Sequence, residues 1–170
     1  MRSGPADRWR PMRPEDLPEI CRIATGAHAD LPERPEVFEE KARLFPAGCF
    51  VLAKDGALVG YAISHPWRLY DIPPLDAFLG ALPPSPDCLF LHDVALTPGA
   101  RGDGATAHLI QRLCNVARKE RLAFLALTSV YGTAGFWAET GFQAASDERL
   151  APKLKSYGAG ALYMIRKLQG

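Results

Sequence analysis

The chain has 170 residues, of which 48% are hydrophobic and 23% are charged, and its formal net charge is +1. This length favours one domain, and a chain of this size buries enough surface to fold without disulfides or metals. A net charge so close to zero excludes a broad electrostatic surface for nucleic acid or anionic lipid.

The first half of the chain shows strand-like, then helical, then again strand-like patterns. In chain order we expect a strand over 7–12, a helix after Pro14, a second helix over 36–44, and strands over 49–54 and 57–63. Asp55-Gly56 tolerates the positive φ of a tight turn and so predicts an antiparallel hairpin. On the second helix, we expect Glu39, Glu40 and Lys41 to face solvent.

A proline-rich segment, residues 66–88, interrupts this pattern. It contains six prolines and is not expected to form a strand or a long helix, although residues 74–81 have room for one helical turn. Its apolar residues, which include Trp67 and Leu75, are too many for a free linker. We expect a packed excursion, either a lid on a pocket or a cover for a sheet edge.

The second half alternates strand and helix. We expect strands over 89–96, 122–128 and 161–167 and one starting at 141, with helices over 105–120 and 132–140. The unit from residue 89 to 127 is long enough for a crossover that joins two parallel strands. A hairpin followed by such a unit predicts a mixed-sheet α/β (α+β) fold, in one domain over residues 1–170.

The turn over residues 98–107 is where we expect the chemistry, because it links a strand to the start of a helix. Unpaired amides and the positive end of the helix dipole favour an anion there, and glycines let the backbone approach it closely. Arg101 adds a positive charge. The turn therefore predicts a phosphate-binding site.

Two nucleotide-binding motifs match this turn only in part. As a P-loop it lacks the phosphate-binding lysine, since Ala105 occupies that place. As a dinucleotide fingerprint it has Gly102-x-Gly104-x-x-Ala107, but the next strand ends in Thr128 rather than near an acidic residue. A dinucleotide-binding domain stays open as an alternative.

A third motif agrees better. Leu91-His-Asp-Val-Ala-Leu96, followed by Thr97-Pro98-x-x-Arg101-Gly102-x-Gly104, resembles the cofactor-binding motif of the GNAT superfamily of acyl-CoA N-acetyltransferases. Residues 131–142 resemble the helix that this family places after its next strand, and the order of elements agrees over nearly the whole chain. The resemblance implies a GNAT-like fold with two splayed parallel strands, and acetyl-CoA as cosubstrate.

The resemblance also assigns residues to the cofactor. Backbone groups of the strand hold the pantetheine arm, amides of the turn cradle the diphosphate, and the short helix lines the thioester end. The residues implied are, in that order, Val94, Ala95 and Leu96; Arg101, Gly102, Asp103, Gly104, Ala105 and Thr106; and Phe136 and Trp137.

One implied role lacks its usual residue. Trp137 stands where the family usually has the tyrosine that protonates the departing thiolate, and an indole N–H is too weak an acid for that. Tyr131, Ser129 and Tyr157 are the candidate replacements, or the thiolate leaves unassisted.

A primary amine must lose a proton before it attacks a thioester, because alkylammonium groups have pKa values near ~10. His92 is the candidate general base, since imidazole titrates near neutral pH and its strand is similar to the Leu-His-x-Leu-Ala-Val strand of arylalkylamine acetyltransferases. The alternative is a core histidine bonded to a backbone carbonyl. Strand alternation is expected to place His92 and Val94 on one face and Asp93 on the other. His65 is a second candidate base.

The sequence thus predicts an N-acetyltransferase that acts by direct attack of a small-molecule or peptide amine. Asp93, Tyr70 and Asp71 are expected to meet this acceptor, with structural capping or solvated loop charges as the alternative. A catalytically silent CoA-binding regulatory module also stays open.

The expected setting is cytoplasmic. Residues 1–11 carry charges and two prolines but no hydrophobic stretch, so we expect no secretory signal. No apolar run approaches the roughly 18–20 residues of a membrane span. The four cysteines and four histidines are scattered, so we expect no metal site. We expect neither a nucleic-acid nor a membrane partner, and the oligomeric state stays open, a homodimer included.

Overall fold

The computed structural model describes residues 8–102 and 104–169, and in this part of the chain seven strands form one mixed sheet in the order β1-β2-β3-β4-β5-β7-β6. The strands are β1 (Trp9–Pro11), β2 (Cys49–Lys54), β3 (Ala57–Trp67), β4 (Cys88–Leu96), β5 (Phe124–Ser129), β6 (Gln143–Ala144) and β7 (Leu162–Lys167). Among these pairs only β4 and β5 run parallel. The expected mixed-sheet fold is confirmed, and it differs from the doubly wound parallel sheet of a dinucleotide-binding domain.

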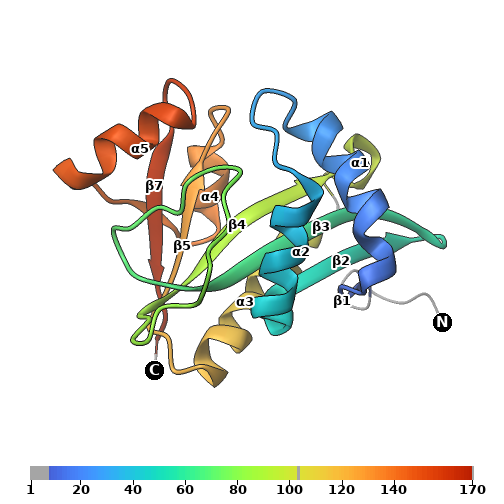
Figure 1. Ribbon diagram of the computed structural model, residues 1–170, viewed down its shortest axis with the longest axis horizontal. Coiled ribbons are helices and arrows are strands. Elements are labelled where there is room, and N and C mark those ends of the chain that lie inside the picture. Colours follow the sequence, from blue (N-terminus) through green and yellow to red (C-terminus); the bar gives the residue numbers. More distant parts are fainter. Residues whose placement is uncertain (1–7, 103, 170) are drawn as a thin grey trace.

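Helices cover both faces of this sheet. α1 and α2 cross one face, and α3 packs on the other (Figure 1). The helices are α1 (Leu17–Ala27), α2 (Pro35–Leu44), α3 (Ala105–Lys119), α4 (Ala134–Glu139) and α5 (Ala151–Ser156). The sequence did not predict α5, because six residues are too few to show a helical period. In the described residues, no helix combines the length and apolarity needed to cross a membrane.

Strand alternation divides the core between the two helical layers, because successive strand residues point to opposite faces. Ala62 packs with Leu109 of α3, whereas its neighbour Tyr61 packs with Ile20 of α1. All four residues are buried. Packing of both helical layers therefore holds the sheet that carries the site residues.

The hairpin of β2 and β3 forms as expected, with Asp55 and Gly56 at φ 52° and 82°. β3 nevertheless continues past its expected end and includes Pro66, which pairs with Leu89 of β4. The expectation of no strand at this proline was wrong. Pairing between β2 and β3 stops at Ile63, so the missing N–H of Pro66 costs no hydrogen bond on that open side.

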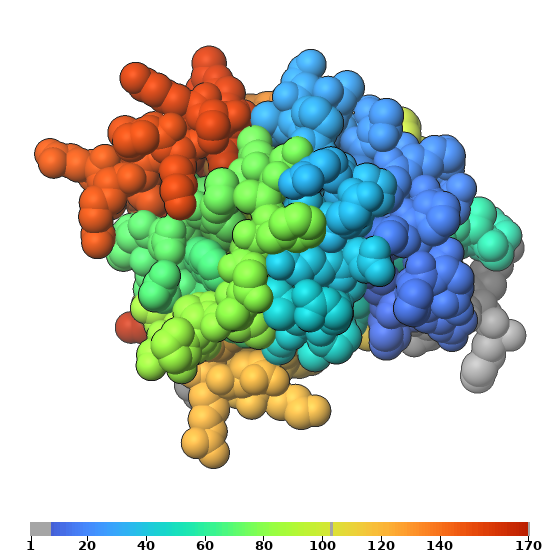
Figure 2. All heavy atoms as spheres, viewed as in Figure 1, coloured from blue at the N-terminus to red at the C-terminus, as the bar shows by residue number. Residues whose placement is uncertain are grey.

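Residues 68–87, which we call the strap, lie against α2 (Figure 2). Glu40 of α2 accepts hydrogen bonds from the amides of Leu79 and Gly80, at 2.6 and 3.0 Å. Lys41 donates from Nζ to the carbonyl of Ala77 at 3.2 Å. The prediction that Glu40 and Lys41 face solvent was wrong, because the strap buries both.

The strap contains no helical turn at residues 74–81. Side chains of α2 bind the backbone of this stretch at Ala77, Leu79 and Gly80. Its inner side chain Ile72 is fully buried and packs with Phe90 and Tyr163. The strap is therefore a packed part of the core, as expected for the proline-rich segment.

Replacing Glu40 tests how firmly the strap is held. Glu40→Ala leaves two strap amides without their acceptor, and we expect the free energy of unfolding to fall by about 1–3 kcal/mol. Glu39→Ala, one position away on the exposed side of α2, should change it by less than about 0.5 kcal/mol. Urea denaturation measures both, and equal effects would contradict the described packing.

Candidate active site

The parallel strands β4 and β5 pair only from Cys88 to Leu91 and from Phe124 to Leu127. Beyond this point β4 stays with β3, and β5 stays with β7. The two strands consequently diverge like the arms of a V (Figure 1). A cavity of about 770 Å³ lies in this wedge and is lined by residues of both arms.

An irregularity in β4 decides which side chains line the cavity. Two adjacent residues of β3 pair with Leu91 and Asp93, so His92 is an extra residue of the kind called a β-bulge. The bulge shifts the alternation, and Leu91 and Val94 pack against the same core cluster. The expectation of opposite faces for His92 and Asp93 was wrong, because both line the cavity.

His92 is paired with a carboxylate that sequence reasoning missed. Its Nε2 lies 3.2 Å from each carboxylate oxygen of Glu33, which belongs to the α1–α2 loop. The His92 side chain is fully buried and that of Glu33 nearly so. Burial disfavours the charge of Glu33, but the hydrogen bond with His92 and the nearby Lys41 outweigh it and lower the pKa of Glu33. Glu33 also accepts from the amide of Asp76 in the strap, at 3.2 Å.

Asp93 has a histidine partner as well. His28, just after α1, places Nε2 3.0 Å from Oδ1 of Asp93 and 3.2 Å from the carbonyl oxygen of Val94. The hydroxyl of Tyr61 donates to the other carboxylate oxygen at 2.8 Å. The cavity therefore contains two histidines, each with Nε2 at a carboxylate. In both, Nδ1 is buried and has no hydrogen-bond partner within residues 8–102 and 104–169.

His65, the second candidate base, lies outside the cavity lining and is fully buried. Its Nδ1 is 3.1 Å from the carbonyl oxygen of Pro66. Burial and the neighbouring His92 lower the pKa of His65 to about 3. His65 therefore stays neutral near physiological pH and is unsuited to accept a proton from an amine.

The predicted acids lie on the β5 side of the cavity. Tyr131, with φ 56°, stacks on His28 with ring centroids 6.0 Å apart and planes at 10°. The hydroxyl of Tyr157 donates to the carbonyl of Pro73 at 2.8 Å. Trp137 is nearly buried and lines the cavity, together with the more exposed Phe136 of the same helix.

Ser129 is the remaining candidate acid. Its hydroxyl lies 3.1 Å from that of Thr133, which donates to the carbonyl of Val130. The Ser129 side chain is buried and is absent from the residues lining the cavity. Its hydrogen bonding is therefore satisfied within the β5–α4 turn.

The glycine-rich turn closes one end of the cavity, where Arg101, Gly102 and Thr106 form the lining. Gly102 and Gly104 have φ of 85° and 82°, and a Cβ at either would meet open space. Gly104 is the N-cap of α3, and no side chain within the described part of the chain caps it. Ala105 follows as the first residue of α3 and is buried. The predicted phosphate-binding residue Asp103 lies outside the described residues.

Two backbone carbonyls of β4 accept hydrogen bonds from side chains that line this cavity. His28 binds the carbonyl of Val94, as above, and Nε of Arg101 donates to the carbonyl of Leu96 at 3.2 Å. These alternate residues lie on the stretch of β4 that β5 leaves unpaired. Val94, Ala95 and Leu96 all line the cavity, as the cofactor prediction requires.

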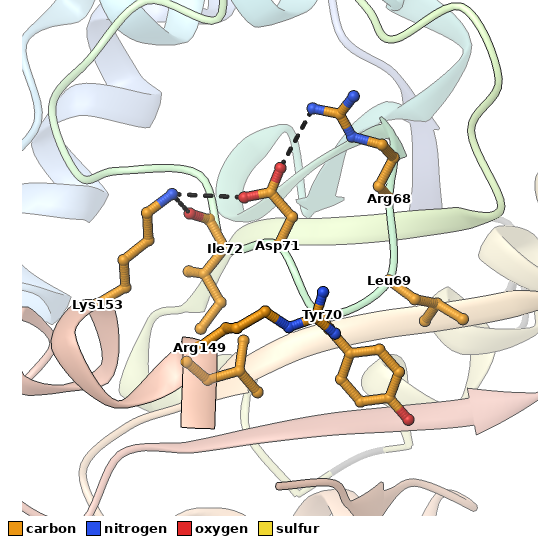
Figure 3. Close-up of a pocket in the computed structure, with 8 residues that line it drawn as sticks. Arg68, Leu69, Tyr70, Asp71, Ile72, Arg149 and Lys153 are labelled. Carbon is orange, nitrogen blue, oxygen red and sulfur yellow. Dashed lines mark hydrogen bonds and ion pairs between the residues drawn. The ribbon is translucent and has the colours of Figure 1, made fainter. Parts of the chain in front are cut away.

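Tyr70 and Asp71 lie elsewhere. They line a separate hollow of about 370 Å³ between the strap and α5, where Asp71 is 3.4 Å from both Arg68 and Lys153 (Figure 3). The amide of Tyr70 donates to the hydroxyl of Tyr163 at 3.0 Å. The structure thus does not bring these two predicted acceptor residues together with His92.

The residues that sequence reasoning missed, His28 and Glu33, both belong to the segment that leaves α1 and enters α2. No motif marks them, since each acts on β4 from about sixty positions away. The available signal was weak: two ionisable residues in a short loop between helices, a usual position for site residues.

The chain matches the model of the Acetyltransferase (GNAT) family over residues 12–142. It therefore belongs to the GNAT family of acetyltransferases. A search of curated proteins finds no match.

Several solved structures have the same fold. The GphF GNAT-like decarboxylase in complex with isobutyryl-CoA aligns with a TM-score of 0.80 and 18% identity, over 95% of this chain and 100% of that chain. N-acetylglutamate synthase from Neisseria gonorrhoeae aligns with a TM-score of 0.71 and 22% identity, over 95% of this chain and 35% of that chain. The ribosomal-protein-S18-alanine N-acetyltransferase from Escherichia coli aligns with a TM-score of 0.65 and 19% identity, over 95% of each chain. These likenesses confirm the GNAT fold.

The buried state of His65 is open to a direct test. An NMR titration of its ring should show no protonation between about pH 7.5 and about 4.5, because its pKa is about 3. The unfolded chain takes up this proton near pH ~6.5, so His65 stabilises the fold above that pH and progressively less as the pH falls. A midpoint near 6.5 for His65 would contradict the described burial.

Proposed function

We propose that this protein transfers an acetyl group from acetyl-CoA to a primary amine by direct attack, without a covalent acyl-enzyme. One observation carries the proposal. A single cavity joins an anion-favouring turn, an unpaired stretch of strand and two histidine–carboxylate pairs. The turn suits a diphosphate, the unpaired strand suits a pantetheine arm, and the histidine–carboxylate pairs suit an attacking amine.

The fit to CoA rests on the wedge and the turn. The start of α3 and the open space at Gly102 and Gly104 suit a diphosphate, with Arg101 and Thr106 beside it. The stretch from Val94 to Leu96 presents backbone groups to an extended arm. When bound, acetyl-CoA supplies the activated acyl group, and its thioester end reaches Phe136 and Trp137.

The Glu33–His92 pair supports a general base. Because a carboxylate accepts only, Nε2 of His92 carries the proton of their hydrogen bond, and the lone pair of the neutral ring is then on Nδ1. Nδ1 is the nitrogen without a partner among the described residues. His92 is therefore arranged to take a proton from the acceptor, and Glu33 stabilises the resulting imidazolium.

The acceptor end of the cavity indicates what kind of amine fits. Leu31, Leu75 and Tyr157 form an apolar wall near His92, and Arg101, at the diphosphate end, is the one lysine or arginine in the described lining. An amine on an apolar skeleton fits this wall better than one that carries a carboxylate, because no lysine or arginine of the described lining lies there to pair with it.

A panel of amines tests the proposed function. Purified protein is mixed with acetyl-CoA and amines of different classes, and free thiol is followed over time. We expect thiol release that depends on both substrates and is fastest with apolar amines. CoA binding without thiol release from any amine would instead favour the silent CoA-binding module.

A second reaction is favoured by Trp137 and by the likeness to a GNAT-like decarboxylase. Decarboxylation of a malonyl-type thioester breaks a C–C bond, moves the electron pair into the thioester enolate, and ends with a proton on the α-carbon. It never expels the CoA thiolate, so it needs no tyrosine at position 137. Release of CO₂ from malonyl-CoA without release of thiol identifies this reaction.

The base assignment predicts the pH dependence. A base must be unprotonated to act, so the pH profile should have a limb on which the rate rises with pH. His92→Gln should remove this ascending limb and lower kcat by roughly 10²- to 10⁴-fold. Glu33→Gln should move the limb to lower pH, because the imidazolium loses its carboxylate partner. If neither substitution changes the ascending limb, a residue other than His92 is the base.

A further inference from the structure

His28 lines the wedge in which the proposed function places the arm of acyl-CoA. It follows the last residue of α1 and reaches the carbonyl of Val94, on the unpaired stretch of β4. From the other arm of the V, Tyr131 stacks nearly parallel on its ring. We propose that His28 is the acid that protonates the CoA thiolate as the C–S bond breaks, an inference that rests on the proposed acetyl transfer.

The orientation of the imidazole is fixed by its partners. Both groups at Nε2 are acceptors, the carboxylate of Asp93 at 3.0 Å and the carbonyl of Val94 at 3.2 Å, so Nε2 carries a proton. The hydroxyl of Tyr61 binds the second oxygen of Asp93 and holds that carboxylate in place. The opposite nitrogen, Nδ1, is consequently the one directed at a further partner.

Nδ1 of His28 is buried and has no hydrogen-bond partner among the described residues. A buried polar nitrogen without a partner is rare in folded proteins and costs stability. In the imidazolium form, Nδ1 carries a second N–H, which the developing thiolate of a bound substrate satisfies. The Nδ1 of His28, which has no partner among the described residues, thus suits the charge that forms on sulfur when CoA departs.

The surroundings of His28 favour its charged form and raise its pKa. Burial disfavours the imidazolium, but the hydrogen bond and charge of Asp93, the Val94 carbonyl and the charge of Glu33 outweigh this and raise the pKa of His28. The groups that face it are Asp93 on β4, Glu33 in the α1–α2 loop and Tyr131 in the β5–α4 turn, with Tyr61 of β3 behind Asp93. No cationic side chain is among them in the described structure.

The other candidate acids are less suited. The hydroxyl of Tyr157 donates to Pro73, and the hydroxyl of Ser129 is paired with Thr133. Burial raises the pKa of Tyr131, which makes its hydroxyl a weaker acid than the imidazolium it covers. Tyr131 then acts by packing on His28 and closing the wedge over it.

The proton balance of the reaction is complete with two histidines. His92 takes a proton from the ammonium of the acceptor, and the neutral nitrogen attacks the thioester carbon. The C–S bond then breaks, its electron pair moves to sulfur, and the Nδ1 proton of His28 follows. The nitrogen loses a second proton as the amide forms, and this proton replaces the one that His28 gave to CoA. His92 releases its proton to solvent.

Substitution of each histidine separates the two roles. Wild-type kcat should follow a bell-shaped pH profile, in which the descending limb reports the loss of the His28 proton, whose pKa is raised above that of a free imidazole. His28→Gln should abolish the descending limb, keep the ascending limb, and lower the plateau of kcat by at least roughly tenfold. His108→Gln, on α3 and outside the cavity lining, is the matched control and should leave the profile unchanged.

Binding of CoA, measured by calorimetry, shows whether the His28→Gln protein is intact. Unchanged CoA affinity together with a lost descending limb supports the acid role. Unchanged affinity with the descending limb retained overturns it, even where acetyl transfer in the wild type stands. Weakened CoA affinity with the limb retained also overturns it and makes His28 a binding residue. If the wild type releases no thiol with any amine, the proposed function and this inference fail together.

Discussion

The early end of pairing between β4 and β5 is the constraint on which the rest of the site depends. Two parallel strands that stayed paired would satisfy each other's backbone groups and leave no space between them. Here the pairing stops at Leu91 and Leu127. Further along β4, the carbonyls of Val94 and Leu96 accept hydrogen bonds from the side chains of His28 and Arg101 instead. Buried backbone groups must find partners, and two carbonyls in the wedge find them in side chains that line the cavity.

The β-bulge at His92 brings two ionisable side chains of β4 to this wedge. Without the extra residue, His92 and Asp93 would face opposite layers of the core and only one would reach the cavity. With it, both do, and each meets a partner from the α1–α2 loop region. The segment from His28 to Glu33 therefore supplies one member of each histidine–carboxylate pair, and Glu33 also binds the strap.

Much of the fold was predictable from local patterns. Asp55-Gly56 sets the hairpin, and the motif from Leu91 to Gly104 identifies the strand, turn and helix of the GNAT family. The sequence also placed Val94 to Leu96 and Thr106 at one cavity, and the structure brings them together with His92. These features depend on residues close in the chain, where spacing is informative.

What could not be predicted depends on contacts between distant residues. Glu40 and Lys41 look like an exposed helix face until the strap, some forty positions later, covers them. Pro66 fits within a strand only because β2 ends beside it. A β-bulge leaves no residue signature in this strand, so the shared face of His92 and Asp93 was also hidden.

A crystal structure with bound acetyl-CoA or CoA tests the central claim most directly. The account predicts a pantetheine arm lying between Val94–Leu96 of β4 and the end of β5, with its diphosphate at the turn before α3. It also predicts the sulfur within hydrogen-bond reach of a histidine nitrogen. An arm bound elsewhere on the molecule, with the wedge filled by protein side chains, would contradict the account.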